Sequence, residues 1–266
     1  MNQGIYLFCL TPENDRLVLA DAGDDPAQPL AAAAVAGVTA IVAPVSLNDF
    51  CGPESRARLA DLAWVGPRAQ RHEEVILAVM RQAPVLPVRF GSVFSSLAAL
   101  SASLERQREA MAQFFLDTAG HQEWTLKAFV DRSQARARVM ATRLAAEKEQ
   151  LDALAPGKRY LQEQKINGVV DREVAFGLKK MAAGISLFFQ EVAPVSCVGR
   201  LLPRDVTGRD DEMFFHSALL VPDGAVAQLQ RLAAAWNARH ASMGMILEAS
   251  GPWPLYHFTP VSSAAP

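Results

Sequence analysis

The fold is decided by one stretch, Pro84-Val85-Leu86-Pro87-Val88-Arg89-Phe90-Gly91-Ser92-Val93-Phe94. Its two prolines lack a backbone N–H donor and fix φ, which favours an extended, edge-like segment over a helix. Apolar residues fill most of the other positions and need a core to pack against. Gly91 stands where the backbone can adopt a positive φ. Because helical patterns flank the stretch, we expect a buried strand that ends in a glycine turn and leads into a helix.

Arg89 is the charged residue inside this apolar run. A buried arginine must either extend its head group to solvent or pair with a carboxylate. Glu73 and Glu74, on the preceding helix, are the expected partners, and loss of that ion pair in Arg89→Ala should lower stability. The functional alternative is that Arg89 anchors a carboxylate or carbonyl group of a partner.

The residues before the stretch predict strands and a divided helix. Gly4–Leu10 is typical of a strand buried on both faces, with Leu17–Ala20 as its hairpin partner, and Val38–Ala43 is a second central strand. Residues 54–82 carry apolar side chains at three- and four-residue steps. Gly66-Pro67 should divide them into two helices, because proline is tolerated only in the first turn of a helix.

From Trp124 onward the pattern predicts the order β, long α, β, β, α, β, which is the split βαβ order of a ferredoxin-like module. The strand at Glu123–Val130 alternates apolar and polar residues and should be half exposed. Two helices within about 132–192 form an antiparallel hairpin. We therefore predict an α+β protein of two domains. They are an N-terminal α+β domain, 1–120, and a ferredoxin-like (βαββαβ) domain with the added hairpin and a C-terminal tail, 121–266.

Composition and charge exclude several classes of protein. The chain has 266 residues, 50% of them hydrophobic and 20% charged, which is the profile of a globular protein. A net charge of -2 gives no general attraction to nucleic acid or to an anionic membrane. Three widely spaced cysteines fit neither a disulfide framework nor a metal knuckle, and no basic export signal is visible. We expect a cytoplasmic protein.

Residues 26–48 carry no charge and are long enough to require a membrane test. Gly37 and Pro44 interrupt them, and the nearest charges, Asp25 and Asp49, are acidic and not the Lys or Arg that orient spanning segments. A buried strand is therefore favoured over a membrane span.

His72-Glu73 is the first candidate for catalytic or metal chemistry. A zinc helix of the HExxH type needs a second histidine where Ile76 stands. His72 also falls on the apolar stripe of its helix, which favours a core histidine with hydrogen-bonded ring nitrogens. Since phosphate-binding and dinucleotide-binding glycine motifs are also absent from the sequence, we expect neither a metal ion nor a cofactor.

The aromatic C-terminal segment, with Trp253 and Tyr256 among prolines, is typical of a core plug, and a protein-contact patch is the alternative. Without an evident active site, the residues favour a binding or assembly role over an enzyme.

Five sequence blocks together resemble the gas vesicle protein F/L family (GvpF/GvpL). The blocks are His72-Glu73-Glu74-Val75, Val85 to Phe94, Glu123-Trp124-Thr125-Leu126-Lys127, Gly157-Lys158-Arg159-Tyr160-Leu161 and Gly251-Pro252-Trp253-Pro254-Leu255-Tyr256-His257-Phe258. They occur in the family's order from one end of the chain to the other, although they do not separate the F from the L type.

The resemblance implies a non-enzymatic accessory protein of gas vesicle formation. Such a protein would bind the small, hydrophobic shell protein and other accessory proteins, assist nucleation or assembly, and in some cases stay in the vesicle. The alternatives are a small-molecule-binding ferredoxin-like module and an enzyme that uses Arg89, His72 and Glu73. The motif and contact candidates are His72, Glu73, Arg89, Phe90, Trp124, Lys127, Trp253 and Tyr256.

Overall fold

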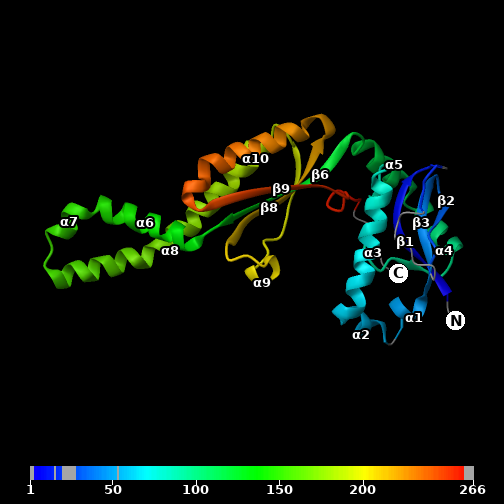
Figure 1. Ribbon diagram of the computed structural model, residues 1–266, viewed down its shortest axis with the longest axis horizontal. Helices are drawn as coiled ribbons and strands as arrows, with labels where there is room; N and C mark the ends of the chain where they lie inside the picture. The colour runs from blue at the N-terminus through cyan, green and yellow to red at the C-terminus, as the bar shows by residue number, and fades with distance from the viewer. Residues whose placement is uncertain (1–2, 15, 20–27, 53, 261–266) are drawn as a thin grey trace. The chain divides into compact units, whose positions relative to one another are not determined.

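The computed structural model describes residues 3–14, 16–19, 28–52 and 54–260 (Figure 1). By its internal contacts the chain divides into two units. Unit 1 comprises residues 1–120 and 253–266, and unit 2 comprises residues 121–252.

The division predicted from the sequence kept residues 121–266 together, whereas the structure groups the segment from Trp253 onward with unit 1. The reason lies in its apolar side chains. Tyr256 and Leu255 pack against two different apolar clusters of unit 1, so the segment finds its buried surface there.

Unit 1 is built around an antiparallel sheet of strand order β2-β3-β1-β4, with β5 also paired to β1. Its elements in chain order are β1 (Gln3–Pro12), β2 (Ala31–Val35), β3 (Val38–Ser46), α1 (Leu47–Phe50), α2 (Ser55–Ala60), α3 (Leu62–Met80), β4 (Leu86–Pro87), β5 (Val93–Phe94), α4 (Leu97–Glu105) and α5 (Arg108–Asp117).

Strand β1 is buried on both faces, as its continuous apolar run predicts. Tyr6 and Phe8 pack in one cluster with side chains of α3. Leu7 and Leu10 pack in a second cluster with side chains of α4 and α5. The sheet of unit 1 is therefore covered by helices on both faces, which places β1 at the centre of its core.

The stretch from Pro84 to Phe94 forms two short strands with a turn between them. Both strands pair with β1: β4 lies opposite Cys9 and Leu10, and β5 lies opposite Ile5 and Tyr6. The turn between them contains Gly91 at φ +85°, a conformation that glycine adopts at no steric cost. The single strand expected here is therefore interrupted by its own glycine turn, which the structure places in the middle of the stretch.

Two further expectations for unit 1 are wrong in the structure. Leu17–Leu19 form no strand and Ala20 lies outside the described residues. β1 pairs instead with β3, which itself forms a hairpin with β2. The helix break falls at Asp61 and not at Gly66-Pro67, which lies inside α3. The Asp61 carboxylate accepts a hydrogen bond from the Ala63 N–H, and this N-cap starts α3 before the proline.

Unit 2 contains a four-stranded sheet of order β7-β8-β6-β9, in which β8 is antiparallel to both β7 and β6. Its elements are β6 (His121–Val130), α6 (Arg132–Ala146), α7 (Lys148–Asp152), α8 (Pro156–Phe189), β7 (Val195–Val198), α9 (Arg204–Thr207), β8 (Glu212–Pro222), η1 (Asp223–Ala225), α10 (Val226–His240), η2 (Ala241–Met243) and β9 (Met245–Trp253).

The core of unit 2 is one apolar cluster that joins the sheet to α8 and α10. Leu126 of β6, Ile185 and Phe189 of α8, and Leu229 and Trp236 of α10 belong to it. Both helices therefore cover the same face of the sheet, and the α+β organisation predicted for the chain is confirmed.

Strand β6 is more buried than its alternating pattern predicts, because its second face is also covered. Thr125 and Phe129 are buried, and the Arg209 guanidinium lies 4.3 Å from the centre of the Phe129 ring. A cation over an aromatic face is a favourable contact. A charged residue from a later loop thus supplies cover that the local pattern does not reveal.

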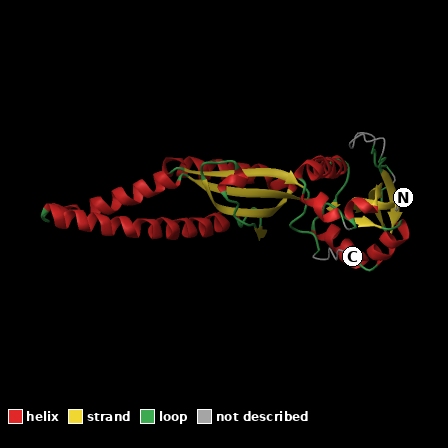
Figure 2. Ribbon diagram, turned by 90° about the horizontal axis from the view of Figure 1, so that it is seen from below, coloured by secondary structure: helices red, strands yellow, loops and turns green. Residues whose placement is uncertain are grey.

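Helices α6 and α8 form the expected hairpin, and its far end, around α7, extends beyond the sheet of unit 2 (Figures 1 and 2). Arg136 of α6 donates to Asn167 and pairs with Asp171 of α8 at 3.2 Å. In the described part of the chain, none of the helices is long and apolar enough to cross a bilayer.

Candidate functional site

His72 lies in the core of unit 1 and links three elements by hydrogen bonds. Its Nδ1 is 3.0 Å from the Tyr6 hydroxyl on β1, and its Nε2 is 3.0 Å from the Val88 carbonyl in the turn after β4. The Tyr6 oxygen also accepts from the Gly91 N–H at 3.0 Å. This chain of bonds, called the His72 network below, fixes the turn against α3 and β1.

The partners define the protonation of the network. A carbonyl oxygen only accepts, so the His72 Nε2 carries the hydrogen and Nδ1 accepts from the Tyr6 hydroxyl. Burial lowers the pKa of the His72 imidazole, and the bond to Val88 partly opposes that shift. Burial also raises the pKa of the Tyr6 phenol. Both groups are therefore neutral near pH 7, with every polar atom of the network paired.

Glu73, next in sequence, binds the C-terminal segment. Its Oε2 accepts a hydrogen bond from the Tyr256 hydroxyl at 3.0 Å. Burial, followed by the charge of Glu73, raises the pKa of the Tyr256 phenol, which keeps the hydroxyl protonated as a donor. Tyr256 is thus attached to α3 through its ring packing and through this bond.

The ion pair expected between Arg89 and Glu73 or Glu74 is wrong. Arg89 is exposed, and within the described residues it forms no ion pair. Glu73 receives Tyr256, and Glu74 accepts from Gln70 on its own helix. His72 holds the turn to α3 instead, through a hydrogen bond to the Val88 carbonyl. Because this partner is a backbone group, the sequence of residue types cannot predict the contact.

We expect Arg89→Ala to change the free energy of unfolding of unit 1 by less than about 0.5 kcal/mol, because an exposed side chain without a pairing partner is removed. Tyr256→Phe, which removes one hydrogen bond to a carboxylate, should cost about 1.5–3 kcal/mol. Urea titration of the two variants beside the parent chain measures the difference. An Arg89→Ala variant less stable than Tyr256→Phe would contradict this assignment.

The other candidate residues are divided between the units. Phe90 is half-buried in unit 1, and its ring lies perpendicular to that of His72 with the ring centres 5.8 Å apart. Trp124 is buried in β6, where its Nε1 donates to Gln122, and Lys127 lies opposite His216 of β8. Trp253 is exposed at the end of β9.

Unit 1 therefore contains His72, Glu73, Phe90 and Tyr256 around one aromatic core, while Trp124 and Lys127 belong to the sheet of unit 2. The His72 imidazole has both nitrogens occupied, and it is buried among rings. In the described ranges of the chain, no group of three His, Cys, Asp or Glu side chains is arranged to hold a metal ion. The arrangement of these residues supports a structural role.

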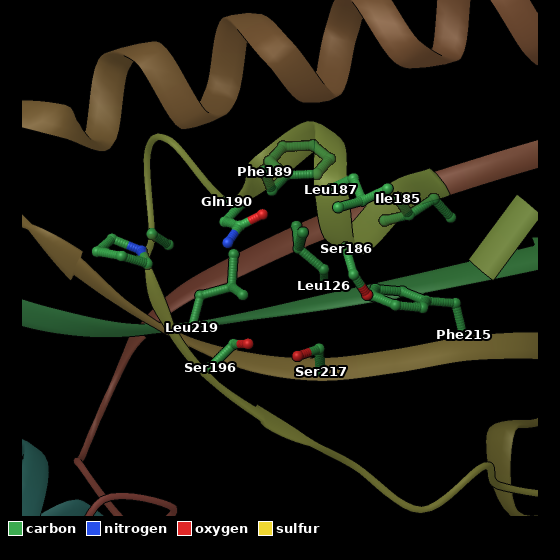
Figure 3. A pocket seen from close by; sticks show the side chains of 12 residues that line it. Leu126, Ile185, Ser186, Leu187, Phe189, Gln190, Ser196, Phe215, Ser217 and Leu219 are labelled. Carbon is green, nitrogen blue, oxygen red and sulfur yellow. The ribbon is translucent and has the colours of Figure 1, made fainter. Parts of the chain in front are cut away.

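A pocket of about 260 Å³ lies in unit 2, between the end of α8 and the sheet (Figure 3). Eight of its twelve lining residues are apolar, the other four are Ser or Gln, and none is charged. Figure 3 shows Ser196 and Ser217 on the strand side and Gln190 on the helix side. Sequence patterns did not point to this pocket, because its wall combines core positions of several elements that are distant in the chain.

One side of the pocket is apolar and open. Leu187, at the end of α8, lines it and is 70% exposed. Val198 of β7 is 91% exposed, and it shares a strand face with Ser196, which lines the pocket. β7 is an edge strand of the sheet of unit 2. The pocket, Leu187, Val198 and this edge together form the surface called the pocket rim.

Comparison with known proteins agrees with the motifs. The family model for gas vesicle synthesis protein GvpL/GvpF matches residues 4–260. The crystal structure of the gas vesicle protein GvpF from Anabaena sp. PCC7120 is similar with a TM-score of 0.72 at 16% identity, covering 98% of this chain and 99% of that one. GvpF from Microcystis aeruginosa is similar with a TM-score of 0.67 at 16% identity, covering 97% and 99%.

No curated protein matches the chain. At 16% identity the two solved structures establish the fold, and the family model, which spans nearly the whole chain, establishes the relationship. The resemblance predicted from the sequence is thereby confirmed: this chain is a member of the GvpL/GvpF family of gas vesicle synthesis proteins.

Proposed function

We propose that this protein is an accessory factor that binds the hydrophobic gas vesicle shell protein and assists its assembly, with the pocket rim of unit 2 as the contact surface. Family membership supports a role in gas vesicle formation. The single observation that carries the finer proposal is an uncharged pocket bordered by the exposed Leu187 and Val198. Large apolar side chains exposed around a concavity are typical of protein-binding surfaces.

The chemistry of the pocket favours a protein side chain over a small-molecule ligand. Its volume of about 260 Å³ is below the range of about 300–1,000 Å³ usual for small-molecule sites. Without a charged group in its wall, it offers no anchor for an ionic substrate. An uncharged side chain fits both its size and its lining.

The edge strand β7 supplies a second element of recognition. Edge strands carry unpaired backbone groups that can pair with an extended segment of a partner. A shell-protein segment paired with β7 would run beside Ser196 and could place one apolar side chain in the pocket. The accessory protein would then hold the shell subunit in solution until it joins the growing vesicle, so we place its action at the gas vesicle.

We also propose that unit 2 is a ferredoxin-like module with an added hairpin. The order of its main elements is β, α, β, β, α, β, and the first and third strands, β6 and β8, are the central pair of the sheet. This agrees with the split βαβ arrangement. The enzyme alternative has less support, because both ring nitrogens of His72 are bonded and Arg89 is exposed.

Co-expression with the shell protein tests the proposal. The parent chain should keep the shell protein soluble and elute with it. Leu187→Glu and Val198→Glu should each weaken this association by about tenfold or more, because a charge would have to be buried. Leu116→Glu is the matched control, since Leu116 is similarly exposed, at 72%, but lies in unit 1.

The outcomes separate the two parts of the proposal. If the shell protein precipitates equally with and without the parent chain, the shell-binding function is wrong. If the parent chain binds it and Leu187→Glu and Val198→Glu bind equally well, the function stands and the pocket rim is wrong. Circular dichroism of each variant confirms that the fold is retained, which is expected because both side chains are exposed.

A further inference from the structure

Helix α8 carries a second exposed face with an unusual charge pattern. Every seventh residue from Lys158 to Lys179 is a cation, and large apolar residues stand between the cations. All of these side chains are exposed, including Phe176 at 69%. The face, called the basic stripe, consists of Lys158, Lys165, Val169, Arg172, Phe176 and Lys179.

The basic stripe lies on the face of α8 away from its packing partner. The buried residues of the helix recur at four-residue steps from Ile166 to Leu178, on the opposite side of the helix. Arg136 of α6 contacts Asn167 and Asp171, at the border of that buried side. Of the elements of unit 2, only α6 and α7 accompany the outer half of α8 (Figures 1 and 2).

The cations of the stripe do not stabilise the helix that carries them. None of Lys165, Arg172 and Lys179 has an acidic residue three or four positions away, so the usual helical ion pairs are missing. Lys158 stands in the first turn, where the helix dipole disfavours positive charge. Within the described residues, these cations form no ion pair.

In contrast, each acidic residue of α8 forms an ion pair with an arginine. The pairs are Glu163 with Arg159, Asp171 with Arg136, and Glu173 with Arg143. The stripe is therefore left with uncompensated positive charge and exposed apolar area, which favours an external partner of negative charge.

We infer that the basic stripe binds an amphipathic helix of a partner protein that carries acidic residues at seven-residue intervals beside an apolar seam. From Lys165 to Lys179 the stripe has heptad spacing, with apolar residues at one seam position and cations at the other. In a coiled coil a charged residue at a seam position selects the partner at a cost in stability. A strict seven-residue repeat drifts about 20° per heptad around a straight helix, so the partner helix would wrap α8 with a left-handed crossing. Acidic side chains would face the four cations, and small or apolar ones would pack on Val169 and Phe176.

Other occupants fit the stripe less well. A second copy of this chain would place cations against cations. A membrane-surface helix needs a broad apolar face, but the broad apolar face of α8 is buried against the rest of unit 2. Nucleic acid would engage the cations and leave Val169 and Phe176 without a partner.

The test uses the full chain and two synthetic helical peptides, each about four heptads long. One places Glu opposite the cations and Leu or Ala on the seam, and the other replaces each Glu by Lys. Fluorescence anisotropy should show binding of the Glu peptide only, weakening as salt rises from about 0.05 to 0.5 M. Lys165→Glu/Arg172→Glu/Lys179→Glu should weaken that binding about tenfold or more and allow binding of the Lys peptide.

Matched variants make the result decisive. Arg56→Glu/Arg200→Glu/Arg231→Glu reverses three exposed arginines outside the stripe and should bind the Glu peptide as the parent chain does. If the stripe variant does not fold, Lys165→Gln/Arg172→Gln/Lys179→Gln should still weaken binding several-fold.

The inference is overturned if the parent chain binds both peptides equally well. It is also overturned if the stripe variants bind the Glu peptide as tightly as the parent chain does. Stripe-dependent binding of phosphatidylglycerol vesicles or duplex DNA without binding of the Glu peptide overturns it as well. The inference is independent of the pocket rim, because stripe variants should retain the shell protein and Leu187→Glu should retain the Glu peptide.

Discussion

His72→Ala is expected to lower the free energy of unfolding of unit 1 by about 2–4 kcal/mol. The substitution leaves the Tyr6 hydroxyl and the Val88 carbonyl without their partner inside a core where His72 itself is only 3% exposed. It also removes a ring packed against Phe8 and Phe90. Lost packing and unpaired polar groups act in the same direction.

Hydrogen exchange followed by mass spectrometry measures this effect separately for each unit, because protection of amides reports local opening. Peptides from β1 and β3 should exchange faster in His72→Ala, while peptides of unit 2 serve as an internal reference. Arg89→Ala, at an exposed residue of the same unit, should change protection by less than about 0.5 kcal/mol. Equal effects of the two substitutions would show that the His72 network contributes little.

Comparing the stability of the parent chain and of His72→Ala at several pH values gives a second test. Burial lowers the pKa of His72 below its ordinary value of 6.5, so the unfolded chain binds a proton below pH 6.5 that the folded chain does not. Stability from the neutral ring is therefore complete above pH 6.5 and is lost as the pH falls below it. The stability difference between the parent chain and His72→Ala should narrow from pH 7.5 to pH 5, and a difference that widens would contradict this sign.

Sequence patterns predicted the elements whose residues carry the signal locally. The apolar run in β1, the central strand β3 and the apolar stripe of α3 appear as expected, since burial on one or both faces imposes a period on the chain. The N-cap at Ser96, which accepts from the Ala99 N–H, is also encoded within a few residues. Such features can be predicted because their causes lie within one helix turn or one strand.

The misplaced features depend on residues that are distant in the chain. Arg89 was expected to be buried, but it lies in an exposed turn. The position of that turn is fixed by the hydrogen bond between Tyr6 and His72, two residues more than sixty positions apart in the chain. The pocket of unit 2 likewise requires α8, β6, β7 and β8 to be packed first. Local sequence patterns give no information on such contacts. The apolar stripe of α3 predicts that His72 lies in the core, but it does not predict which groups bind the ring.

Gly251→Ala is expected to destabilise unit 2 by about 2–4 kcal/mol. A Cβ at this position would lie 2.8 Å from Cδ2 of Trp124 and 2.9 Å from the Glu123 carbonyl oxygen, and the backbone has φ +157°. The strained φ and the two close contacts each raise the energy of the folded state when residue 251 carries a side chain. The Trp124 ring is buried and the Glu123 oxygen belongs to the backbone of β6, so neither neighbour can move aside without disturbing the sheet.

Gly177→Ala is the control that isolates this cause. Gly177 lies inside α8, and no described atom beyond its own stretch of helix lies within 4 Å of the position that a Cβ would take. Alanine should therefore stabilise unit 2 by about 0.5–1 kcal/mol through helix propensity. Opposite signs for the same chemical change are the expected result, measured as hydrogen-exchange protection in β6 and β8. A neutral Gly251→Ala would contradict the close approach of β9 to β6 at Trp124. The Trp124 ring would then have to move aside for the new Cβ, and it would not be a fixed part of the packing of the sheet.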